Sequence, residues 1–568
     1  MKKLINDPGS VVREMLEGAA AVSPSQAVLA GETVVVRRSA ASGGGPVAVI
    51  SGGGSGHEPA HAGFVGEGML AAAIAGNVFT SPSVDDVLAG LRVVRGPQGV
   101  LMIVKNYTGD RLNFGLAAEI ARAEGVPVEI VVVADDVALR DTVERRQRRG
   151  IAGTVLVHKV AGAAAAAGLP LAEVAALARR AADCMGSMGV ALNGCTLPGA
   201  VRGGFDLADD EIELGLGIHG EPGVMRTAMK PADELVGLMV ALILDDLAIG
   251  TERPVALLVN GLGGTPAMEL DIVLRAALAQ LRTRRFDVMR AWRGTLLSAL
   301  DMPGCSISVM PLDEELLALL DAPTDAPAWP GSGQLNAQPT LPGRPVPALD
   351  EPTVTDTAGG GVGLRRVAAA AALALLAAEA QLTELDTRAG DGDLGASMTR
   401  AARAIIELPD GVWSSPAGAL AAMGNALRRA VGGSSGPFYA TALLRASRQL
   451  GSLGVPSLAD WSDAFEAGVA AIMELGGARP GDRTMVDALA PAAEALAAAV
   501  AQGAKAYDAA RACAEAASDG AASTASMAPR LGRSSYLGNR VLGSPDGGAV
   551  AVRIWLGAIT EAIDHQAT

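Results

Sequence analysis

The N-terminal half of the chain alternates short runs of β-branched residues with stretches that have the helical spacing of apolar positions. Buried strands are predicted at Val47–Ile50, Val100–Val104, Val128–Val133, Val155–Val157 and Val255–Val259, and helices at Phe114–Glu124 and Leu171–Ala182. Alternation of this kind is typical of α/β layers around a mainly parallel sheet.

Two changes of composition divide the chain. A glycine-rich break near Met185–Gly204 predicts two α/β sub-domains, about residues 1–185 and 186–325. Eight prolines between Ala322 and Pro352 remove any regular period, so a linker is predicted at about residues 326–355. The remainder, about residues 356–568, is Ala/Leu-rich helix with glycine-rich interruptions. The predicted fold class is therefore multidomain, with an α/β N-terminal half and an all-α C-terminal half.

The composition limits the partners that are plausible. Half of the 568 residues are hydrophobic but only 3% are aromatic, so the cores must be built from Ala, Leu and Val. The formal charge is −15, from 61 acidic and 46 basic residues, which argues against nucleic acid or an anionic membrane as a partner. An anionic substrate is still compatible, because a local metal site inverts the field around it.

The sequence also indicates in which cellular compartment the protein is expected. Met1-Lys-Lys is followed by Asp7-Pro8-Gly9, where a signal peptide would need an apolar core. The apolar run Val367–Ala378 is too short to span a bilayer. The cysteines have neither metal-ligand spacing nor the density of a disulfide framework: Cys184, Cys195, Cys305 and Cys513. We expect a soluble cytoplasmic protein with no membrane partner.

Three aspartates, Asp386, Asp391 and Asp393, lie within eight residues, and glycines flank two of them. Gly and Asp are both unfavourable inside a helix, so this composition predicts a loop. Carboxylate oxygens are ligands that Mg²⁺ prefers, and bound Mg²⁺ commonly takes phosphate oxygens as well. The alternative is a solvated acidic turn, which a single Asp-Gly pair would favour.

A glycine-rich loop follows the strand predicted at Val47–Ile50 and leads into His57-Glu58-Pro59-Ala60-His61. Glycines let a ligand approach the backbone, and amides at a strand end can bind oxyanions or sugar oxygens. The last five residues match the HExxH pattern of zinc proteases, but Pro59 would break the helix that this pattern needs. His57 is either a ligand-binding residue or a turn residue held by hydrogen bonds.

The segment from Lys105 to Asp110 follows the next predicted strand. Ligands of α/β sheets bind beyond the carboxyl ends of strands, so Asp110 and His57 are candidates for one pocket. Asp110 is a candidate general base toward a hydroxyl group. The alternative is that it caps a helix beginning near Leu112.

His219 lies inside a further glycine-rich turn, Gly215–Gly223. A neutral imidazole nitrogen is a usable nucleophile toward a carbonyl carbon. A lone histidine is more often structural. However, only five histidines occur in the chain, and two of them lie in glycine loops of the same α/β half, which favours a functional role.

None of the six lysines directly follows a glycine, so a Walker-type P-loop is excluded. The helical half instead has glycine- and hydroxyl-rich loops at Gly432–Gly436, Gly481–Met485 and Gly532–Gly538. Amides at a helix N-terminus bind phosphate, so these loops are candidates for a nucleotide site. Each loop by itself also fits a plain interhelical turn.

Together these motifs resemble the ATP-dependent dihydroxyacetone kinase family, in the single-chain form that fuses a sugar-binding half to a nucleotide-binding half. The resemblance extends over nearly the whole chain outside the linker. It rests on Ser51–His57, Val78–Pro82, Lys105–Asp110, Gly217–Pro222, Leu385–Gly395, Gly432–Pro437, Gly481–Met485 and Arg533–Gly538.

The resemblance implies that His219 adds to the ketone carbon as a hemiaminal, that Asp110 takes the proton of the terminal hydroxyl, and that His57 assists. The other substrate contacts that it implies are Gly54, Ser55, Gly56 and Lys105. The ligands that it implies for two Mg²⁺ ions on the phosphates of ATP are Asp386, Asp391 and Asp393. The nucleotide contacts that it implies are Leu394, Gly395, Ala396, Ser397, Ser434, Ser435, Gly476, Thr484, Met485, Arg533, Asp546, Gly547 and Gly548. It further implies a helical barrel for the C-terminal half and a homodimer.

Three features depart from the family pattern. Leu394 stands where some relatives have a polar residue, and Gly547 stands where proline is common. Both concern nucleotide contacts, so they bear on donor affinity rather than on the chemistry. The segment Ser298–Cys305 also differs from common forms of the family.

The expected activity is phosphorylation of a small ketose or aldose, dihydroxyacetone and also glyceraldehyde. A hemiaminal selects for a carbonyl group, so glycerol should be rejected. The alternatives are a tetrulose kinase acting on erythrulose, a lyase that cyclises FAD at the same metal site, and a non-enzymatic ligand-binding regulator. The three aspartates speak against the regulator, because a binding protein needs no metal loop.

Overall fold

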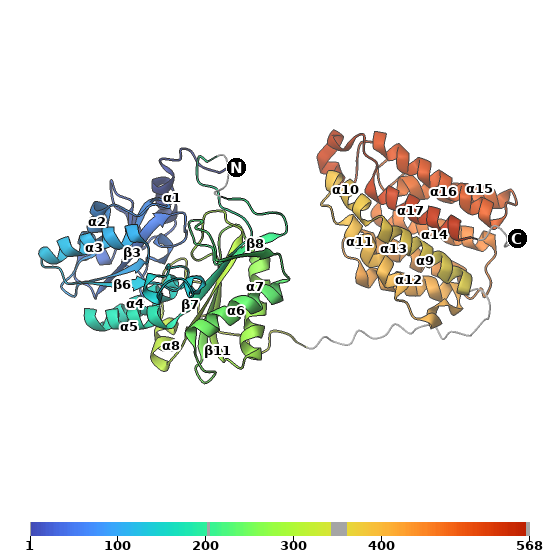
Figure 1. Cartoon of the computed structure of the whole chain (residues 1–568). Helices are drawn as coiled ribbons and strands as arrows, with labels where there is room; N and C mark the ends of the chain where they lie inside the picture. The colour runs from blue at the N-terminus through green and yellow to red at the C-terminus, as the bar shows by residue number, and fades with distance from the viewer. Residues whose placement is uncertain (1, 201–204, 342–360, 564–568) are drawn as a thin grey trace. The chain divides into compact units, whose positions relative to one another are not determined.

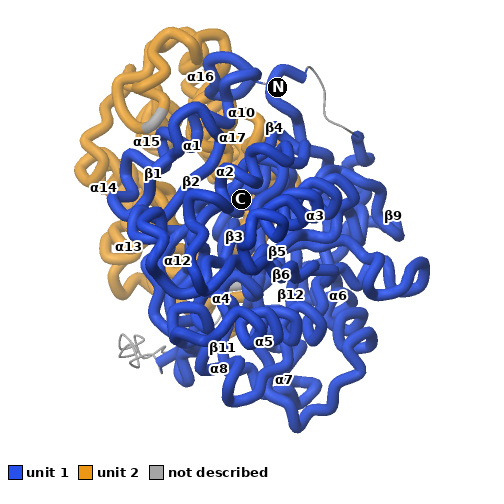
Figure 2. The backbone as a smooth tube through the Cα atoms, turned by 90° about the vertical axis from the view of Figure 1, so that its left-hand side faces the viewer, with its two compact units in different colours: residues 1–341 blue, residues 342–568 orange. Residues whose placement is uncertain are grey.

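The computed structural model describes residues 2–200, 205–341 and 361–563. The chain forms two compact units, Met1–Leu341 and Pro342–Thr568 (Figure 2). The first unit is α/β and the second is helical throughout its described residues. This confirms the predicted fold class.

The first sheet, of which β3 and β6 are labelled in Figure 1, has the strand order β1-β2-β4-β3-β5-β6. β3 pairs in parallel with β4 and β5, and β5 with β6, whereas β1 and β2 pair antiparallel. One face is covered by α2 and α3, and the other by α1, α4 and α5. The bounds are β1 (Gln26–Val28), β2 (Val34–Arg37), β3 (Ala48–Ser55), β4 (Ala72–Val78), β5 (Val100–Lys105), β6 (Val128–Val133), α1 (Val11–Ala21), α2 (Val84–Val94), α3 (Thr108–Ala123), α4 (Thr154–Ala166) and α5 (Leu171–Cys184).

The second sheet has the order β11-β10-β12-β7-β8-β9. Only β10 and β11 pair in parallel, so the prediction of a mainly parallel sheet is wrong here. Two of the antiparallel pairs, β7–β8 and β8–β9, join strands that are consecutive in the chain, and such neighbours need no crossover helix. The bounds are β7 (Gly186–Ala191), β8 (Glu211–Leu214), β9 (Met225–Ala228), β10 (Val255–Gly261), β11 (Val288–Gly294), β12 (Gly304–Pro311), α6 (Ala232–Leu247), α7 (Ala267–Thr283) and α8 (Glu314–Asp321).

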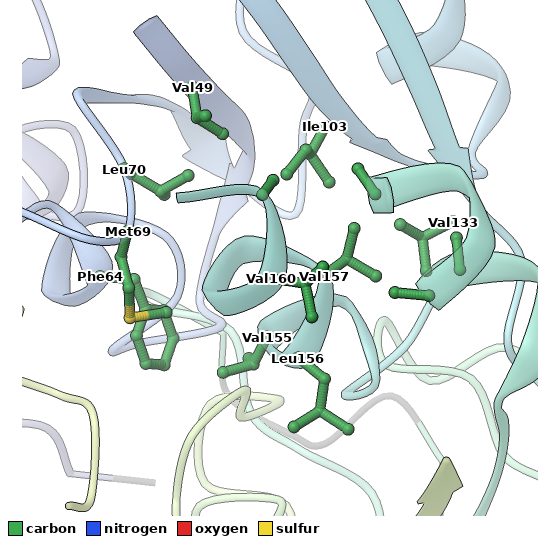
Figure 3. Packing of buried hydrophobic residues seen from close by; sticks show 14 of the residues in the cluster. Val49, Phe64, Met69, Leu70, Ile103, Val133, Val155, Leu156, Val157 and Val160 are labelled. Carbon is green, nitrogen blue, oxygen red and sulfur yellow. The ribbon is translucent and has the colours of Figure 1, made fainter. Parts of the chain in front are cut away.

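Helix α4 lies in a core that both sheets share. Its residues belong to one hydrophobic cluster with residues of β3, β5 and β6 from the first sheet and of β10 and β12 from the second. Val155–Val157, predicted as a strand, are consecutive positions of this helix (Figure 3). That prediction is wrong because a helix buried on all sides has no polar face, so its β-branched run is indistinguishable from a buried strand.

The second unit is a closed ring of helices. Contacts run in order from α9 to α11, α12, α13, α14, α15, α16 and α17, and α17 returns to α9, while the short α10 packs outside on α11 and α17. The ring encloses an apolar cavity of about 560 Å³. The bounds are α9 (Gly361–Ala377), α10 (Glu379–Ala389), α11 (Leu394–Ile406), α12 (Pro416–Ala430), α13 (Ser435–Leu450), α14 (Leu458–Gly476), α15 (Val486–Ala501), α16 (Ala506–Ser523) and α17 (Gly547–Ala562).

The start of the predicted linker is held on the first unit. The backbone N–H of Ala328 donates to the carbonyl of Gly63, and the rings of Trp329 and Trp292 lie 5.0 Å apart. The rest of the predicted linker, from residue 342 to 355, lies outside the described residues.

No single helix among the described residues is long and apolar enough to cross a membrane. One pair, Gly363–Ala377 with Glu379–Ala389, meets the length and composition of a span together but is bent by 60° at its break. The four cysteines are free.

Two helix-interior glycines of the first unit should respond oppositely to substitution. A Cβ on Gly162 of α4 would lie 2.2 Å from Met69 Cα, whereas a Cβ on Gly115 of α3 would have no neighbour within 4 Å. We expect Gly162→Ala to destabilise the protein by about 1–3 kcal/mol and Gly115→Ala to stabilise it by about 0.5–1 kcal/mol. Chemical unfolding of the two variants measures both changes, and equal effects would contradict this packing of α4.

Candidate active site

Two neighbouring strands of the first sheet end at the candidate sugar site. β3 and β5 run parallel, so the segments that follow Ser55 and Lys105 leave the same edge of the sheet. A Cβ on Gly53 would lie 2.7 Å from Lys105 Nζ and 3.4 Å from Asp110 Oδ2. The ammonium and the carboxylate therefore converge on space that the missing side chain of Gly53 leaves open.

Asp110 lies in the first turn of α3, which begins at Thr108 rather than near Leu112. Tyr107 occupies the N-cap position, so the N-cap alternative for Asp110 is wrong. The hydroxyl of Ser81 donates to Asp110 Oδ1. Its place in the first turn also puts this side chain at the positive end of the helix dipole.

The second half of the site comes from the connection between β8 and β9. His219 Nε2 lies 3.0 Å from His57 Nε2. The outer nitrogen of each ring is also hydrogen-bonded: His57 Nδ1 lies 2.8 Å from the carbonyl oxygen of Ser298, and His219 Nδ1 lies 2.8 Å from Glu221 Oε1. The two histidines thus form one chain of hydrogen bonds from Ser298 to Glu221.

The partners at the two ends fix the protons in this chain. A carbonyl oxygen only accepts, so His57 Nδ1 is protonated and its Nε2 has a lone pair. The 3.0 Å contact between the inner nitrogens then requires a proton on His219 Nε2, while His219 Nδ1 donates to the Glu221 carboxylate. In this arrangement His219 donates the bond between the two inner nitrogens and His57 accepts it.

The surroundings agree with this assignment. Burial, and then the positive charges of Lys105 and His219, lower the pKa of His57 well below its usual value. Burial tends to raise the pKa of Glu221, but the hydrogen bond and charge of His219 outweigh it and hold that pKa at about 2. His57 is fully buried, whereas 20% of the His219 side chain is exposed. His219 is thus the ring that a ligand can reach.

Aromatic edges and backbone close the rest of this site. The rings of Phe79 and Tyr107 meet His219 edge-on at 5.1 and 4.6 Å. The backbone N–H of Gly56 donates to both carboxylate oxygens of Glu58, at 3.0 and 3.1 Å. In this structure that amide is therefore not a free donor for a sugar oxygen. The Ser55 hydroxyl donates to the carbonyl of Gly76.

The segment from His57 to His61 is a turn, followed by a short 3₁₀ helix at Ala62–Phe64, and not the long α-helix of a zinc protease. His61 instead lies 2.9 Å from Lys105, with its Nε2 toward Nζ. Burial lowers the pKa of Lys105, and the charges of Asp110 and Glu58 oppose that shift.

A second candidate site lies in the helical unit. Asp386 lies in the last turns of α10, Asp391 in the following turn, and Asp393 at the N-cap position of α11. One oxygen from each lies within 4.8 Å of the others. Asp386 Oδ2 also accepts the N–H of Leu394 at 3.2 Å, which fixes its orientation. Three hard oxygen donors at this spacing fit Mg²⁺. Asp386 is helical, which the loop prediction did not foresee.

Most of the predicted nucleotide contacts lie at helix N-termini. Leu394, Gly395, Ala396 and Ser397 begin α11, Ser434 and Ser435 begin α13, Thr484 and Met485 precede α15, and Asp546, Gly547 and Gly548 begin α17. Gly476 ends α14, and a Cβ there would lie 2.9 Å from the ring of Phe438 in the first turns of α13. Arg533 begins a 3₁₀ segment, and its side chain lies outside the described residues.

Three of these N-termini meet. A Cβ on Gly547 would lie 2.8 Å from Leu394 Cδ2, and a Cβ on Gly548 would lie 3.4 Å from Met485 Cβ. The two residues that depart from the family pattern therefore contact each other, and the bulk of Leu394 occupies space that a larger residue at position 547 would need. Aligned N–H groups of α11 and α17 are suited to phosphate.

Comparisons with known proteins match both the α/β half and the helical half of the chain. The Dak1 domain model matches residues 17–328 and the DAK2 domain model matches residues 388–561. The triokinase/FMN cyclase of Homo sapiens is 44% identical over 574 residues, with 99% of each chain covered. The D-erythrulose kinase of Mycolicibacterium smegmatis is 38% identical, again with 99% of each chain covered.

The chain belongs to the dihydroxyacetone kinase family. The crystal structure of the dihydroxyacetone kinase from C. freundii in complex with AMP-PNP and Mg²⁺ matches it with a TM-score of 0.63 at 35% identity, covering 99% of this chain and 100% of that one. Like the other kinases of this family, the protein is a phosphotransferase.

Sequence reasoning missed several residues of this kinase site. Glu221 and Tyr107 stand within quoted motifs, and an acidic residue two positions after His219 was an available signal. Ser298 is 241 residues from His57, so no local pattern could pair them. Its segment, Ser298–Cys305, is one that departs from the family, and it positions His57 through this bond.

The buried carboxyl of Asp546 should make the stability of the kinase depend on pH. Burial raises the pKa of Asp546 to about 6 from 3.8, so the folded state loses stability as pH rises between those values. Asn at this position still accepts the Ala549 N–H. We expect Asp546→Asn to exceed wild type in free energy of unfolding by up to about 3 kcal/mol near pH 8, and by nothing near pH 4. Urea unfolding at both pH values is the measurement, and a difference that does not change with pH would contradict it.

Proposed function

We propose that the protein transfers the γ-phosphoryl group of ATP to a hydroxyl of dihydroxyacetone and also of glyceraldehyde. The observation that supports this most strongly is the His57–His219 pair, anchored by Glu221, next to Lys105 and Asp110. Capture of a ketose requires a nucleophilic ring with a proton acceptor beside it. Deprotonation of the ketose hydroxyl requires a separate carboxylate.

In this proposal His57 first accepts the Nε2 proton of His219. The freed lone pair of His219 adds to the carbonyl carbon, and the carbonyl oxygen takes the proton back from His57. This gives a hemiaminal with a neutral hydroxyl, and the substituted ring of His219 keeps its positive charge next to the Glu221 carboxylate. Glu221 keeps the ring in place through its bond to Nδ1. The covalent bond orients a substrate that offers little surface for binding.

Asp110 then takes the proton of the terminal hydroxyl as its oxygen bonds to the γ-phosphorus of ATP and the bond to ADP breaks. The Lys105 ammonium holds substrate oxygens beside it. Asp386, Asp391 and Asp393 would hold magnesium, two ions as the family resemblance implies, with the phosphates at the N-termini of α11 and α17. Magnesium supplies neutralisation of the phosphate charge. We also propose a homodimer, for which the family resemblance is the support and sedimentation analysis the test.

Two further candidates have specific support. A relative named D-erythrulose kinase favours a four-carbon ketose, which the same His219 chemistry would serve. A relative named triokinase/FMN cyclase favours cyclisation of FAD at the same aspartates. Assays with dihydroxyacetone, glyceraldehyde, both erythruloses and FAD, each with product analysis, distinguish the three activities.

Replacing His219 should abolish capture of the sugar. Mass spectrometry of the wild type with dihydroxyacetone should show an adduct on the peptide that contains His219, and His219→Ala should show none. The variant should lose activity by about 10³-fold or more. Glycerol is the control substrate and should be phosphorylated by neither protein. Rapid phosphorylation of glycerol, or full activity of His219→Ala, would refute the proposal.

Replacing one of the three aspartates should affect metal use and leave sugar capture intact. We expect Asp391→Asn to raise the Mg²⁺ concentration for half-maximal activity by about tenfold or more, because one hard oxygen ligand becomes a weaker amide. The dihydroxyacetone adduct should persist. Asp508→Asn, which changes a half-exposed carboxylate on α16, is the matched control. An unchanged Mg²⁺ requirement in Asp391→Asn would exclude it as a ligand.

A further inference from the structure

The Lys105 ammonium is buried at the end of β5, with none of the residue exposed. An ammonium has three N–H donors, and each one that lacks an acceptor in a buried site costs free energy. Among the described residues, the hydrogen bond that this ammonium makes is to His61 Nε2, at 2.9 Å. His61 belongs to the HExxH match that has no protease role, and the proposed chemistry gives it no function.

The direction of this bond follows from its neighbours. A charged Lys105 can only donate, so His61 Nε2 has the lone pair and His61 Nδ1 has the proton. His61 Nδ1 lies 3.3 Å from Ser51 Oγ, and the Ser51 hydroxyl donates to the carbonyl of Ile103 at 2.7 Å. The chain of bonds thus runs from Lys105 through His61 and Ser51 to the carbonyl of Ile103. Lys105 and Ile103 both belong to β5, so the chain begins and ends on the same strand.

We propose that His61 is a positioning residue for the phosphorylation reaction: its Nε2 lone pair holds the Lys105 ammonium over Gly53, beside Asp110, where substrate oxygens bind. This inference rests on the proposed sugar kinase activity. His61 touches neither substrate nor nucleotide in it, and acts only through Lys105. Its neutral tautomer is essential, because a protonated ring would repel the ammonium instead of accepting from it.

The charged and titratable groups around Lys105 come from three elements. Asp110 faces it from α3, Glu58 and His57 from the segment after β3, and His158 from α4. The two carboxylates favour the charged ammonium, whereas burial opposes it. Loss of the His61 lone pair therefore shifts the balance toward the neutral amine. Burial and the charge of Lys105 keep His61 itself neutral by lowering its pKa well below the usual value.

His158 provides a matched control for His61. It is also fully buried, and its ring lies 5.1 Å from that of His61. However, both of its ring nitrogens lack a hydrogen-bond partner in the part of the chain that the structure describes. An aromatic replacement at position 158 therefore removes a buried histidine from the same core without removing an acceptor from Lys105.

The test compares His61→Leu, His61→Gln and His158→Phe with wild type in full-length protein, with dihydroxyacetone and ATP as substrates. Leucine fills the space without an acceptor, and glutamine restores an acceptor near the position of Nε2. We expect kcat/KM for dihydroxyacetone to fall roughly 10–100-fold in His61→Leu, while KM for ATP stays within about twofold. His61→Gln should recover most of the loss, and His158→Phe should remain near wild type.

The pH profile separates positioning from a structural role. Without its acceptor the Lys105 ammonium loses its proton more readily. The alkaline limb of the pH profile of kcat/KM should therefore move to lower pH in His61→Leu, and it should not move in His61→Gln or His158→Phe. Thermal unfolding of each variant reports whether it folds. A folded His61→Leu with wild-type kcat/KM and an unmoved limb overturns this inference alone. Equal losses in His61→Leu, His61→Gln and His158→Phe also overturn it. A wild type that phosphorylates no triose overturns the proposed function.

Discussion

The contact between His57 Nε2 and His219 Nε2 forms only when the two sheets of the first unit are fixed relative to each other. His57 follows the end of β3 in the first sheet, whereas His219 and Ser298 belong to connections of the second. The shared core around α4 supplies that fixation, because one hydrophobic cluster contains residues of this helix and of strands from both sheets. This shared apolar core thus determines where the two imidazole rings lie relative to each other. The chemistry of the pair depends on packing some distance from it.

The candidate sugar site combines several groups that are unfavourable to bury. Lys105 and His57 are fully enclosed, and Glu58 has a raised pKa because of burial. Each of these polar groups is hydrogen-bonded, which offsets much of the cost of desolvation. The glycines at the end of β3 allow this crowding, since a Cβ on Gly54 would lie 2.6 Å from the backbone nitrogen of Thr80. Such a concentration of buried ionisable groups in one place is typical of a functional site.

The helical unit places its polar groups differently from the first unit. Its ring of helices is rich in alanine, so neighbouring helices approach closely and an apolar cavity is left inside. The polar chemistry is confined to helix ends, where unpaired N–H groups and the helix dipole favour anions. The contact between Leu394 and Gly547 joins two of these ends. A larger residue at position 547 should therefore need a smaller one at position 394.

By itself the sequence determined the α/β and all-α halves, four strands and two helices of the first unit, and the motifs that contain His57, Lys105, Asp110, His219 and the three aspartates. These features have local causes, since apolar spacing and glycine or aspartate content act over a few residues. Tertiary structure alone decided that Val155–Val157 are helical, that the second sheet is mostly antiparallel, and that Ser298 and His61 hold the reactive groups. The physical reason is that these outcomes depend on which distant segments meet. A short stretch of sequence indicates that a side chain is buried, but not what it is buried against.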